Sequence, residues 1–367
     1  MKILFDHQVF SSANYGGVAL YFYELMKGLS KNGHQLENTV KFSENVFTTD
    51  RLIFNSVPLL PRLKFRGRVR LKNSINQVYT NAALKRNDFD IFHPTNYDTY
   101  YLSKLSPKKP LVTTFYDLNH ERLANGNAEI SGTDQMISNR KKILSASSKV
   151  IAISHSTKND IVDYYKVDPS RIEVIHLSSS LKMDQLHKDE SLGDYILFVG
   201  NRQGYKNFTK FVSAITPALK KNKSLKLVCA GGGDFSKKEH DSLNELKIQS
   251  QVINMPINDL LLSQLYYNAL FFVFPSLYEG FGIPILESLS CNCPALLSDR
   301  SSLPEIGGSA AMYFNPEDEE DILDKVELLL SNQSLRDEMK QMGKKQSERF
   351  SWDKMTQETI SLYKSQL

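Results

Sequence analysis

The sequence is poor in cysteine and has no long hydrophobic run. The sequence has three cysteines, Cys229, Cys291 and Cys293, which is an odd number and too few for a disulfide scaffold. This favours a reducing compartment. The longest apolar run, residues 269–274, is far shorter than the roughly 18–20 residues that cross a bilayer. The opening residues 1–7 turn polar too early for a secretory signal peptide. These absences predict a cytoplasmic protein.

The signatures of several enzyme classes are also missing. No G-x-G-x-x-G follows the first predicted strand, and there is no Walker A sequence, which argues against a dehydrogenase or an NTPase. Residues 231–233 are three glycines after a strand but lack the dinucleotide-binding spacing. Cys291 and Cys293 form an isolated C-x-C without a second pair, so no zinc site is expected. The pair Asp88 and Asp90 precedes a strand, and we interpret it as loop and cap chemistry. We therefore expect no metal.

Acidic residues are absent from residues 51–87, which carry nine basic ones. Six of the nine are interleaved with Leu63, Phe65, Val69 and Leu71, and they are Arg62, Lys64, Arg66, Arg68, Arg70 and Lys72. Basic side chains among apolar ones suit an anionic membrane surface or a lipid-linked phosphate. The alternative is a solvated loop and helix start. Nucleic acid is not expected, because no recognisable binding motif accompanies the basic residues.

Short apolar runs alternate with amphipathic stretches along the whole chain. Many of the runs are apolar throughout, which is typical of strands buried on both faces of a parallel sheet. The predicted strands are 2–5, 91–93, 111–115, 150–153, 172–177, 195–199, 225–230, 251–255, 270–274, 294–297 and 310–314. Helical periodicity fills the gaps, as in 18–31, 158–165, 208–220 and 319–330. This alternation predicts an α/β fold with doubly wound parallel sheets.

Eleven strands are too many for one small sheet, so we predict two domains. The polar stretch 178–193 lacks periodicity and separates them. We place the first domain at residues 1–180 and the second at 181–351. In open sheets of this class, ligands bind beyond the carboxyl ends of the strands. The loops after each strand are therefore where chemistry is expected.

The most informative segment is residues 274–287, Phe-Pro-Ser-Leu-Tyr-Glu-Gly-Phe-Gly-Ile-Pro-Ile-Leu-Glu. It starts at a strand end, and its glycines allow close approach of a ligand to the backbone. Pro284 suits a first helical turn. Free N–H groups at such a helix start form an anion site suited to a diphosphate. Glu279 and Glu287 flank this site, and their partners would be sugar and ribose hydroxyls.

A second segment, residues 200–207, follows another strand. Its sequence, Gly-Asn-Arg-Gln-Gly-Tyr-Lys-Asn, puts Arg202 and Lys206 at a strand's carboxyl end. Two cations there could neutralise a diphosphate leaving group. The alternative is ordinary surface charge.

Together these segments resemble the retaining nucleotide-sugar glycosyltransferases of glycosyltransferase family 4. Residues 279–287 match the family's E-x7-E motif, residues 200–207 match its phosphate-gripping loop, and residues 301–305 continue the pattern. Weaker similarities are the glycine loop Gly16-Gly17, the strand 150–154, and residues 350–352 at the start of a C-terminal helix. The resemblance implies the GT-B fold of two Rossmann-like domains facing each other across a cleft. It also implies that the helix at 352–367 packs back on the first domain.

The resemblance further implies residue roles. Glu287 would bind the ribose hydroxyls, and Glu279 would hold hydroxyls of the transferred sugar. Arg202 and Lys206 would stabilise the departing diphosphate. Backbone groups would serve the donor along the loop and helix start, at Gly280, Phe281, Gly282 and Ile283, and in the first domain at Gly16 and Gly17.

Two positions depart from the family pattern. Tyr116-Asp117 stands where many members have a histidine before aspartate that touches the transferred sugar. Asp117 and the nearby His120 are therefore candidates for that role, with Tyr116 as the alternative to His120. Asn292 replaces a glycine that usually precedes the proline, and we interpret it as a turn residue.

The resemblance implies a retaining transferase, which we expect to be metal-independent because cations and backbone N–H groups already serve the phosphates. It would move a hexose from GDP-mannose, towards which the resemblance leans, or from a UDP- or dTDP-hexose, to a hydroxyl of a lipid-linked glycan of O-antigen or capsule type. The acceptor is expected on the first domain, and the basic segment is expected to bring the protein to the inner face of the cytoplasmic membrane. The alternatives are a nucleotide-sugar epimerase or hydrolase on the same fold, or a sensor that binds the donor without turnover.

Overall fold

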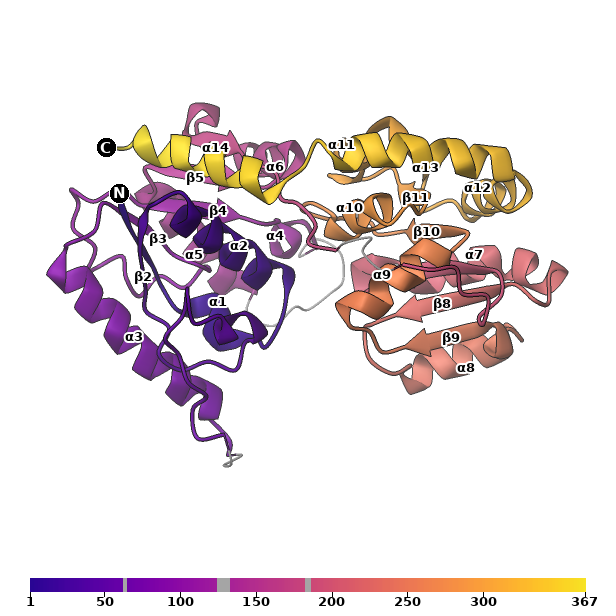
Figure 1. Cartoon of the computed structure of the whole chain (residues 1–367), viewed down its shortest axis with the longest axis horizontal. Helices are drawn as coiled ribbons and strands as arrows, with labels where there is room; N and C mark the ends of the chain where they lie inside the picture. The colour runs from indigo at the N-terminus through magenta and orange to yellow at the C-terminus, as the bar shows by residue number, and fades with distance from the viewer. Residues whose placement is uncertain (62–64, 124–132, 182–185) are drawn as a thin grey trace. The chain divides into compact units, whose positions relative to one another are not determined.

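The computed structural model describes residues 1–61, 65–123, 133–181 and 186–367. The chain forms two compact units: Met1–Leu177 with Trp352–Leu367, and Ser178–Ser351. In Figure 1 each unit is a parallel sheet with helices on both faces. Among the described residues, no helix combines the length and the apolar character needed to cross a membrane.

The first unit contains two short parallel sheets that continue one another. The strand orders are β2-β1-β3 and β4-β5-β6. A bridge between Phe92 and Leu111 joins β3 to β4. The strands are β1 (Lys2–Phe5), β2 (Gln35–Asn38), β3 (Ile91–His93), β4 (Val112–Phe115), β5 (Lys149–Ala152) and β6 (Ile172–Val174). Because β1 leads to β2 on one side and β3 lies on the other, the chain changes direction across the sheet between β1 and β3, where such sheets bind ligands.

Seven α-helices are described in this unit. They are α1 (Gln8–Ser12), α2 (Gly17–Lys31), α3 (Arg68–Arg86), α4 (Asn119–Leu123), α5 (Thr133–Ala146), α6 (His155–Tyr165) and α14 (Trp352–Lys364), with 3-10 turns at Val46–Thr49 and Pro169–Arg171. The C-terminal helix α14 lies along α2, as Figure 1 shows. Gly28 of α2 makes this close approach possible, since a Cβ there would clash with Thr356.

A buried histidine ties α14 to the sheet. His93 Nδ1 lies 2.5 Å from the Tyr363 hydroxyl, and its Nε2 lies 2.9 Å from Thr114 Oγ1. Burial lowers the pKa of His93 to about 3, so the ring is neutral at any physiological pH. The C-terminal helix is thus held by a hydrogen-bonded contact inside the core of the first unit.

The second unit holds one six-stranded parallel sheet in the order β12-β11-β10-β7-β8-β9. The strands are β7 (Tyr195–Val199), β8 (Lys226–Ala230), β9 (Val252–Met255), β10 (Phe271–Phe274), β11 (Ala295–Ser298) and β12 (Ala311–Phe314). The α-helices are α7 (Phe208–Lys221), α8 (Lys237–Glu245), α9 (Asp259–Asn268), α10 (Ile283–Ser290), α11 (Leu303–Gly307), α12 (Glu319–Ser331) and α13 (Gln333–Ser347), and the 3-10 turns are Gly204–Lys206, Gln249–Gln251 and Gly308–Ala310. The strand order reverses between the neighbours β7 and β10. The loops that follow these two strands therefore meet at the switch point of the sheet.

The predicted α/β fold with two doubly wound parallel-sheet units is confirmed. Each of the eleven predicted strands corresponds to a strand of the structure. The prediction missed β2, whose sequence Gln-Leu-Glu-Asn is polar and which lies at the sheet edge with its side chains partly exposed. An edge strand of this kind lacks the apolar run by which buried strands are found.

Candidate functional site

The two predicted phosphate and sugar segments meet at the switch point of the second sheet. The Leu277 N–H, after β10, donates to the Tyr205 carbonyl, after β7, at 2.7 Å. Lys206 Nζ lies 2.6 Å from Glu279 Oε1, and both side chains are largely buried, at 17% and 13% exposed. The structure thus brings together a cation and a carboxylate that the sequence separates by 73 positions.

The loop before α10 is held in a fixed path. Gly282 has φ +105°, and a Cβ at this position would lie 2.8 Å from Ile285 Cδ1, so only glycine fits. Ser302 Oγ lies 2.9 Å from the carbonyl oxygens of both Glu279 and Phe281. Because the Ser302 hydroxyl holds these two carbonyl oxygens, the backbone at the start of α10 is pre-organised.

The other predicted loop residues lie at this helix start. Gly280 and Phe281 are buried, and Ile283 is the first residue of α10, with Pro284 directly after it. The Glu279 N–H donates to Ser301 Oγ at 2.9 Å. Ser301 and Ser302 were predicted only as a continuation of the motif, and no local pattern in the sequence indicates that they brace the Glu279 loop.

Glu287 lies in α10, one turn beyond this start. Tyr266 of α9 donates its hydroxyl to Glu287 Oε2 at 3.1 Å. Burial raises the pKa of Glu287 to about 7, against the lowering effect of the Tyr266 hydrogen bond and with a contribution from Asp259. The carboxyl therefore changes its charge near neutral pH, which is unusual for a glutamate and typical of functional positions.

Arg202 is bound within the protein. Its side chain is 2% exposed, and Nε forms an ion pair with Glu239 Oε1 at 2.7 Å. Its Nη atoms donate to the carbonyls of Gly231, Gly233 and Asp234 at 2.9–3.0 Å. Arg202 thus organises the glycine loop after β8, and in this state most of its donors are not available to a ligand.

The same glycine loop packs closely on the loop after β7. A Cβ at Gly232 would lie 2.5 Å from the Gly200 carbonyl oxygen and 3.0 Å from Arg202 Nη1. All three glycines, 231–233, have φ of +74° to +78°. These glycines therefore serve a close backbone approach.

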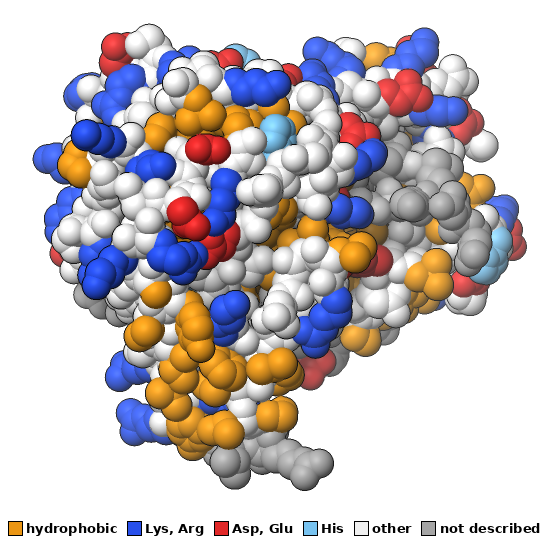
Figure 2. All heavy atoms as spheres, turned by 60° about the vertical axis from the view of Figure 1, so that its left-hand side comes forward, with side chains coloured by type: hydrophobic (Ala, Val, Ile, Leu, Met, Phe, Trp, Pro, Cys, Tyr) orange, Lys and Arg blue, Asp and Glu red, His pale blue; other side chains and the backbone are white. Residues whose placement is uncertain are grey.

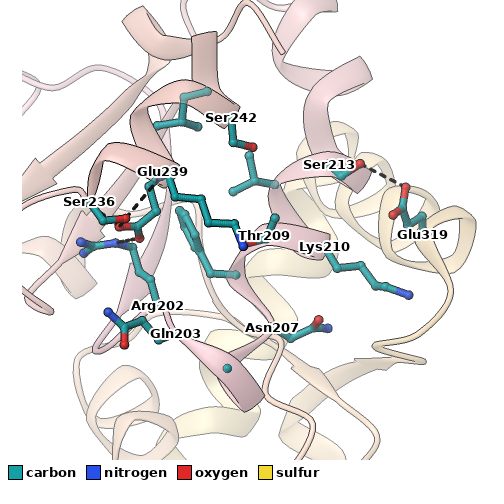
Figure 3. A pocket seen from close by; sticks show the side chains of 15 residues that line it. Arg202, Gln203, Asn207, Thr209, Lys210, Ser213, Ser236, Glu239, Ser242 and Glu319 are labelled. Atoms are coloured by element: carbon teal, nitrogen blue, oxygen red, sulfur yellow. Dashed lines mark hydrogen bonds and ion pairs between the residues drawn. The ribbon is translucent and has the colours of Figure 1, made fainter. Parts of the chain in front are cut away.

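A cavity of about 720 Å³ adjoins Arg202 on the side of α7 and α8. Figure 3 shows Arg202, Glu239 and Ser236 gathered at one end and the Ser213–Glu319 hydrogen bond at the other. Glu279 and Glu287 are not among its lining residues. The cavity adjoins the loop after β7 but does not include the predicted carboxylates.

In the first unit, Gly16 and Gly17 begin α2. Gly16 has φ +155°, and no atom lies within 4 Å of where its Cβ would be. Gly17 is the first residue of the helix. The backbone at Gly16 therefore has open space beside it into which a ligand group could come.

Asp117 and His120 follow β4. Asp117 Oδ1 lies 3.5 Å from Nη2 of the buried Arg140, whose other amino group bonds Glu121 at 2.6 Å. His120 is partly buried on the short helix α4. Tyr116 is in the core, and its hydroxyl donates to the Thr95 carbonyl at 3.3 Å. Of the two alternatives for the family histidine, the structure leaves His120 nearer to solvent.

The basic segment does not face solvent as a whole, which corrects the prediction. Lys72 is buried and forms an ion pair with Glu44, and Arg68 Nη2 lies 2.6 Å from the same carboxylate. Arg66 and Arg70 are exposed. Arg62 and Lys64 lie outside the described residues. The sequence suggested an uncompensated segment because Glu44 lies before its start.

Two further predictions concern turns and caps. Asn292 has φ +57°, a left-handed conformation that asparagine tolerates, in agreement with its interpretation as a turn residue. Asp90 Oδ2 accepts the Lys2 N–H at 2.7 Å, and Asp88 pairs with the Lys2 ammonium. Both aspartates are therefore engaged at the start of β1.

Comparison with known proteins identifies the family. The profile of Glycosyltransferase Family 4 matches residues 15–178, and that of Glycosyl transferases group 1 matches residues 182–346. O-antigen chain mannosyltransferase B of Escherichia coli is 42% identical over 103 residues, which are 28% of this chain and only 27% of that protein. The uncharacterized glycosyltransferase MJ1607 of Methanocaldococcus jannaschii is 24% identical over 379 residues, with 95% and 94% of the two chains covered.

A solved structure shares the fold over the whole length. Anabaena Alr3699/HepE, in complex with UDP and glucose, has a TM-score of 0.74 at 14% identity, with 100% of both chains covered. The two profiles together span both units. The strand order places the two motif segments, residues 200–207 and 274–287, at the switch point of the second sheet. This chain belongs to glycosyltransferase family 4 and has the GT-B fold.

Proposed function

We propose that this protein transfers a hexose from a nucleotide diphosphate sugar to a hydroxyl of a lipid-linked cell-surface glycan, with retention of the anomeric configuration. The observation that carries the proposal is the Lys206–Glu279 pair, which lies at the switch point directly before α10. A cation, a carboxylate and a helix start at one place match the phosphates and hydroxyls of such a donor.

The residues take distinct roles in this proposal. Lys206 and the N-terminus of α10 bind the diphosphate, whose charge grows as the glycosidic bond breaks, and so lower the barrier. Glu279 accepts hydrogen bonds from the transferred sugar, and Glu287 from the ribose. Arg202 acts by holding the glycine loop through its bonds to Glu239 and the loop carbonyls.

The donor is proposed to be GDP-mannose, with a UDP- or dTDP-hexose as the alternative. The relative named as an O-antigen chain mannosyltransferase supports mannose and an O-antigen type of acceptor. The fold relative bound to UDP and glucose supports a nucleotide sugar in general. Transfer should continue in excess EDTA, because Lys206 and the backbone N–H groups of α10 provide positive charge for the phosphates.

The test is transfer from each radiolabelled donor to a lipid-linked glycan acceptor, with the product's anomeric configuration read by NMR. Lys206→Met should lower kcat by about 100-fold or more, since it removes a group that binds the developing charge. Lys210→Met is the matched control, because Lys210 lies four residues away on α7 and its ammonium donates to the Glu317 carbonyl at 3.1 Å. Equal activity of the two variants would refute the assignment of Lys206.

The alternative enzymes differ in what they need. An epimerase or a hydrolase would convert the donor with no acceptor present, whereas a transferase would consume it at a substantial rate only with acceptor. A sensor would bind the donor and leave it intact. Donor turnover measured with and without acceptor therefore separates a transferase and a sensor from the other two enzymes, and the product, an isomeric nucleotide sugar or a free sugar, separates an epimerase from a hydrolase.

The membrane part of the proposal rests on a mixed surface beside α3. Leu60, Phe65, Val69 and Leu71 are 42–52% exposed, next to the exposed Arg66 and Arg70. Figure 2 shows hydrophobic side chains gathered at the bottom of the view, with Lys and Arg side chains beside them. Apolar groups that enter the headgroup region and cations that meet anionic lipid would act together there.

Vesicle flotation tests this surface. Binding to anionic vesicles at low salt should exceed binding to neutral ones and fall with ionic strength. Arg66→Glu with Arg70→Glu should abolish the difference. Lys344→Glu with Lys345→Glu makes the same change in charge on the exposed face of α13 and should leave it intact. Equal binding to both kinds of vesicle would refute the membrane role.

A further inference from the structure

The first unit contains a polar cavity at its own switch point. The cavity has a volume of about 360 Å³ and lies among residues that follow β1 and β3 and residues of α3 and α5. Its size is at the small end of the range for ligand pockets, about 300–1,000 Å³. The residues used below are His7, Gln8, Asn73, Asp98 and Tyr100, all of which line it.

Two buried polar atoms on its wall have no hydrogen-bond partner among the described residues. His7 is 4% exposed, and the described part of the chain offers its Nε2 no hydrogen-bond partner. The side-chain amide oxygen Oδ1 of Asn73, on α3, is also buried, and none of the described residues donates to it. Leaving such groups unpaired costs free energy, about 1–3 kcal/mol each, so each indicates a missing partner.

The hydrogen bonds around His7 determine which of its two ring nitrogens carries the hydrogen. His7 Nδ1 lies 3.0 Å from Ser11 Oγ, which also accepts the amide N–H of Asn76 at 2.7 Å. Ser11 is fully buried, and Nδ1 is the acceptor within reach of its hydroxyl proton. Ser11 therefore donates to Nδ1, and His7 Nε2 carries the hydrogen. The cavity thus presents an N–H donor at His7 and a carbonyl acceptor at Asn73.

Hydrogen bonds and ring stacking hold the side chains in and behind the cavity wall. The side-chain amide of Asn76 is fully engaged, because its oxygen accepts the N–H groups of Lys41 and Phe42 and its nitrogen bonds Ser11 and the Phe42 carbonyl. Gln8 bonds both the N–H and the carbonyl of Asp98. The His7 ring is stacked with Tyr100 at 5.9 Å between centroids.

The charge of the lining excludes a phosphate. No lysine or arginine lines the cavity, and Asp98 is its one charged lining residue among the described parts of the chain. Burial lowers the pKa of His7, against the raising effect of Asp6 and Asp98, so the imidazole is neutral. Amides, a neutral imidazole and tyrosine rings suit a neutral polyhydroxylated ligand.

We infer that this cavity binds the sugar ring of the acceptor, with His7 Nε2–H donating to one of its hydroxyl oxygens and the Asn73 carbonyl accepting from another. The inference deepens the proposed function and rests on it. His7 is here a binding residue and not a base, because its outward nitrogen already carries a hydrogen.

The first experiment is NMR of protein with isotope-labelled histidine. His7→Phe assigns the His7 signal among the eight histidines. The ring nitrogen shifts should identify the Nε2–H form, and methyl α-mannoside or another of a panel of neutral methyl hexosides should perturb that signal. Perturbation by inorganic phosphate or a nucleoside diphosphate instead, or by none of these probes, would overturn the inference.

Kinetics provide the second experiment. His7→Phe keeps an aromatic ring against Tyr100 and Asn73→Leu keeps the volume, and each should raise the acceptor KM about tenfold while leaving the donor KM unchanged. Asn81→Leu is the control, because Asn81 is on the same helix and also has an unpartnered buried oxygen, but does not line the cavity. An unchanged acceptor KM in both test variants would overturn the inference.

The two proposals fail in distinguishable ways. If no nucleotide sugar is bound or consumed, the proposed function is wrong. If the donor is bound and transferred while the His7 signal and the acceptor KM do not respond, only the acceptor cavity is wrong. Thermal unfolding of each variant separates either result from misfolding.

Discussion

Glu287 gives the sharpest prediction, because its charge should depend on pH in the range where the enzyme is assayed. Burial raises its pKa from the ordinary 4.5 to about 7. A carboxylate accepts hydrogen bonds from two ribose hydroxyls, whereas a carboxylic acid has given up part of that capacity to its own proton. Donor binding should therefore favour the ionised form, and donor affinity should rise with pH.

The magnitude follows from linkage. If only the ionised form binds, donor affinity should rise about tenfold from pH 6 to pH 8, with half of the protein competent near pH 7. The unliganded protein should respond in the opposite direction. The folded state holds this proton more tightly than the unfolded chain, so the free energy of unfolding should fall by ~3 kcal/mol as the pH rises from about 4.5 to 7.

The assay is calorimetric titration with an intact nucleotide sugar. A free nucleoside diphosphate is unsuitable because its terminal phosphate titrates near pH 6, by analogy with phosphate monoesters of pKa about 6. Glu287→Gln should bind more weakly and lose the pH dependence. An affinity that does not change between pH 6 and 8 in the native protein, or an equal slope in the variant, would refute the role of Glu287.

Three other variants test the roles read from the structure. Arg202→Ala should lower the unfolding midpoint markedly, because loss of a buried ion-pair partner costs ~3–5 kcal/mol. Melting followed by circular dichroism measures this, and an unchanged midpoint would contradict the role of Arg202 in holding the glycine loop. Lys206→Ala should also lower the midpoint, because it leaves the mostly buried Glu279 carboxylate without this partner, but it should in addition reduce kcat, and an unchanged kcat in steady-state kinetics would contradict its role. His93→Phe should destabilise the first unit by ~1–3 kcal/mol, because the buried Tyr363 hydroxyl loses its hydrogen bond to His93 and Thr114 keeps only its bond to Tyr21. Denaturant unfolding would measure this, and an unchanged stability would contradict the link to α14.

The fold could be predicted because buried parallel strands carry their signal in a few consecutive residues. Runs such as Tyr195–Val199 and Phe271–Phe274 are apolar at every position and buried at every position. The missed strand β2 is stabilised by pairing with β1, and only one edge of it is covered. Its identity depends on a neighbour more than thirty residues away, which no local window contains.

The site could be predicted only in part, for the same reason. The backbone conformations that glycine and Pro284 favour depend on the residue itself, so they can be predicted from the local sequence. The positive φ of Gly282 agrees with this prediction. The partner of a charged side chain can lie far away in the sequence, so the local sequence does not predict it. Lys72 was predicted as a surface cation, but it is buried and pairs with Glu44. Arg202 was predicted as a ligand for phosphate, and in this structure its guanidinium donates to the carbonyls of the glycine loop.

The Lys206–Glu279 pair bears on how donor binding would work. In the unliganded protein each group satisfies the other in a mostly buried setting, where an unpaired charge would be costly. A donor that brings phosphate to Lys206 and hydroxyls to Glu279 replaces one set of partners with another and leaves neither charge exposed. Because the pair already fixes both side chains at the start of α10, little further ordering is needed, and more of the interaction is available for the transition state. Weakening the pair from one side, as in Glu279→Gln, should therefore lower kcat more than it weakens donor binding, and the opposite ratio would show that the pair serves binding alone.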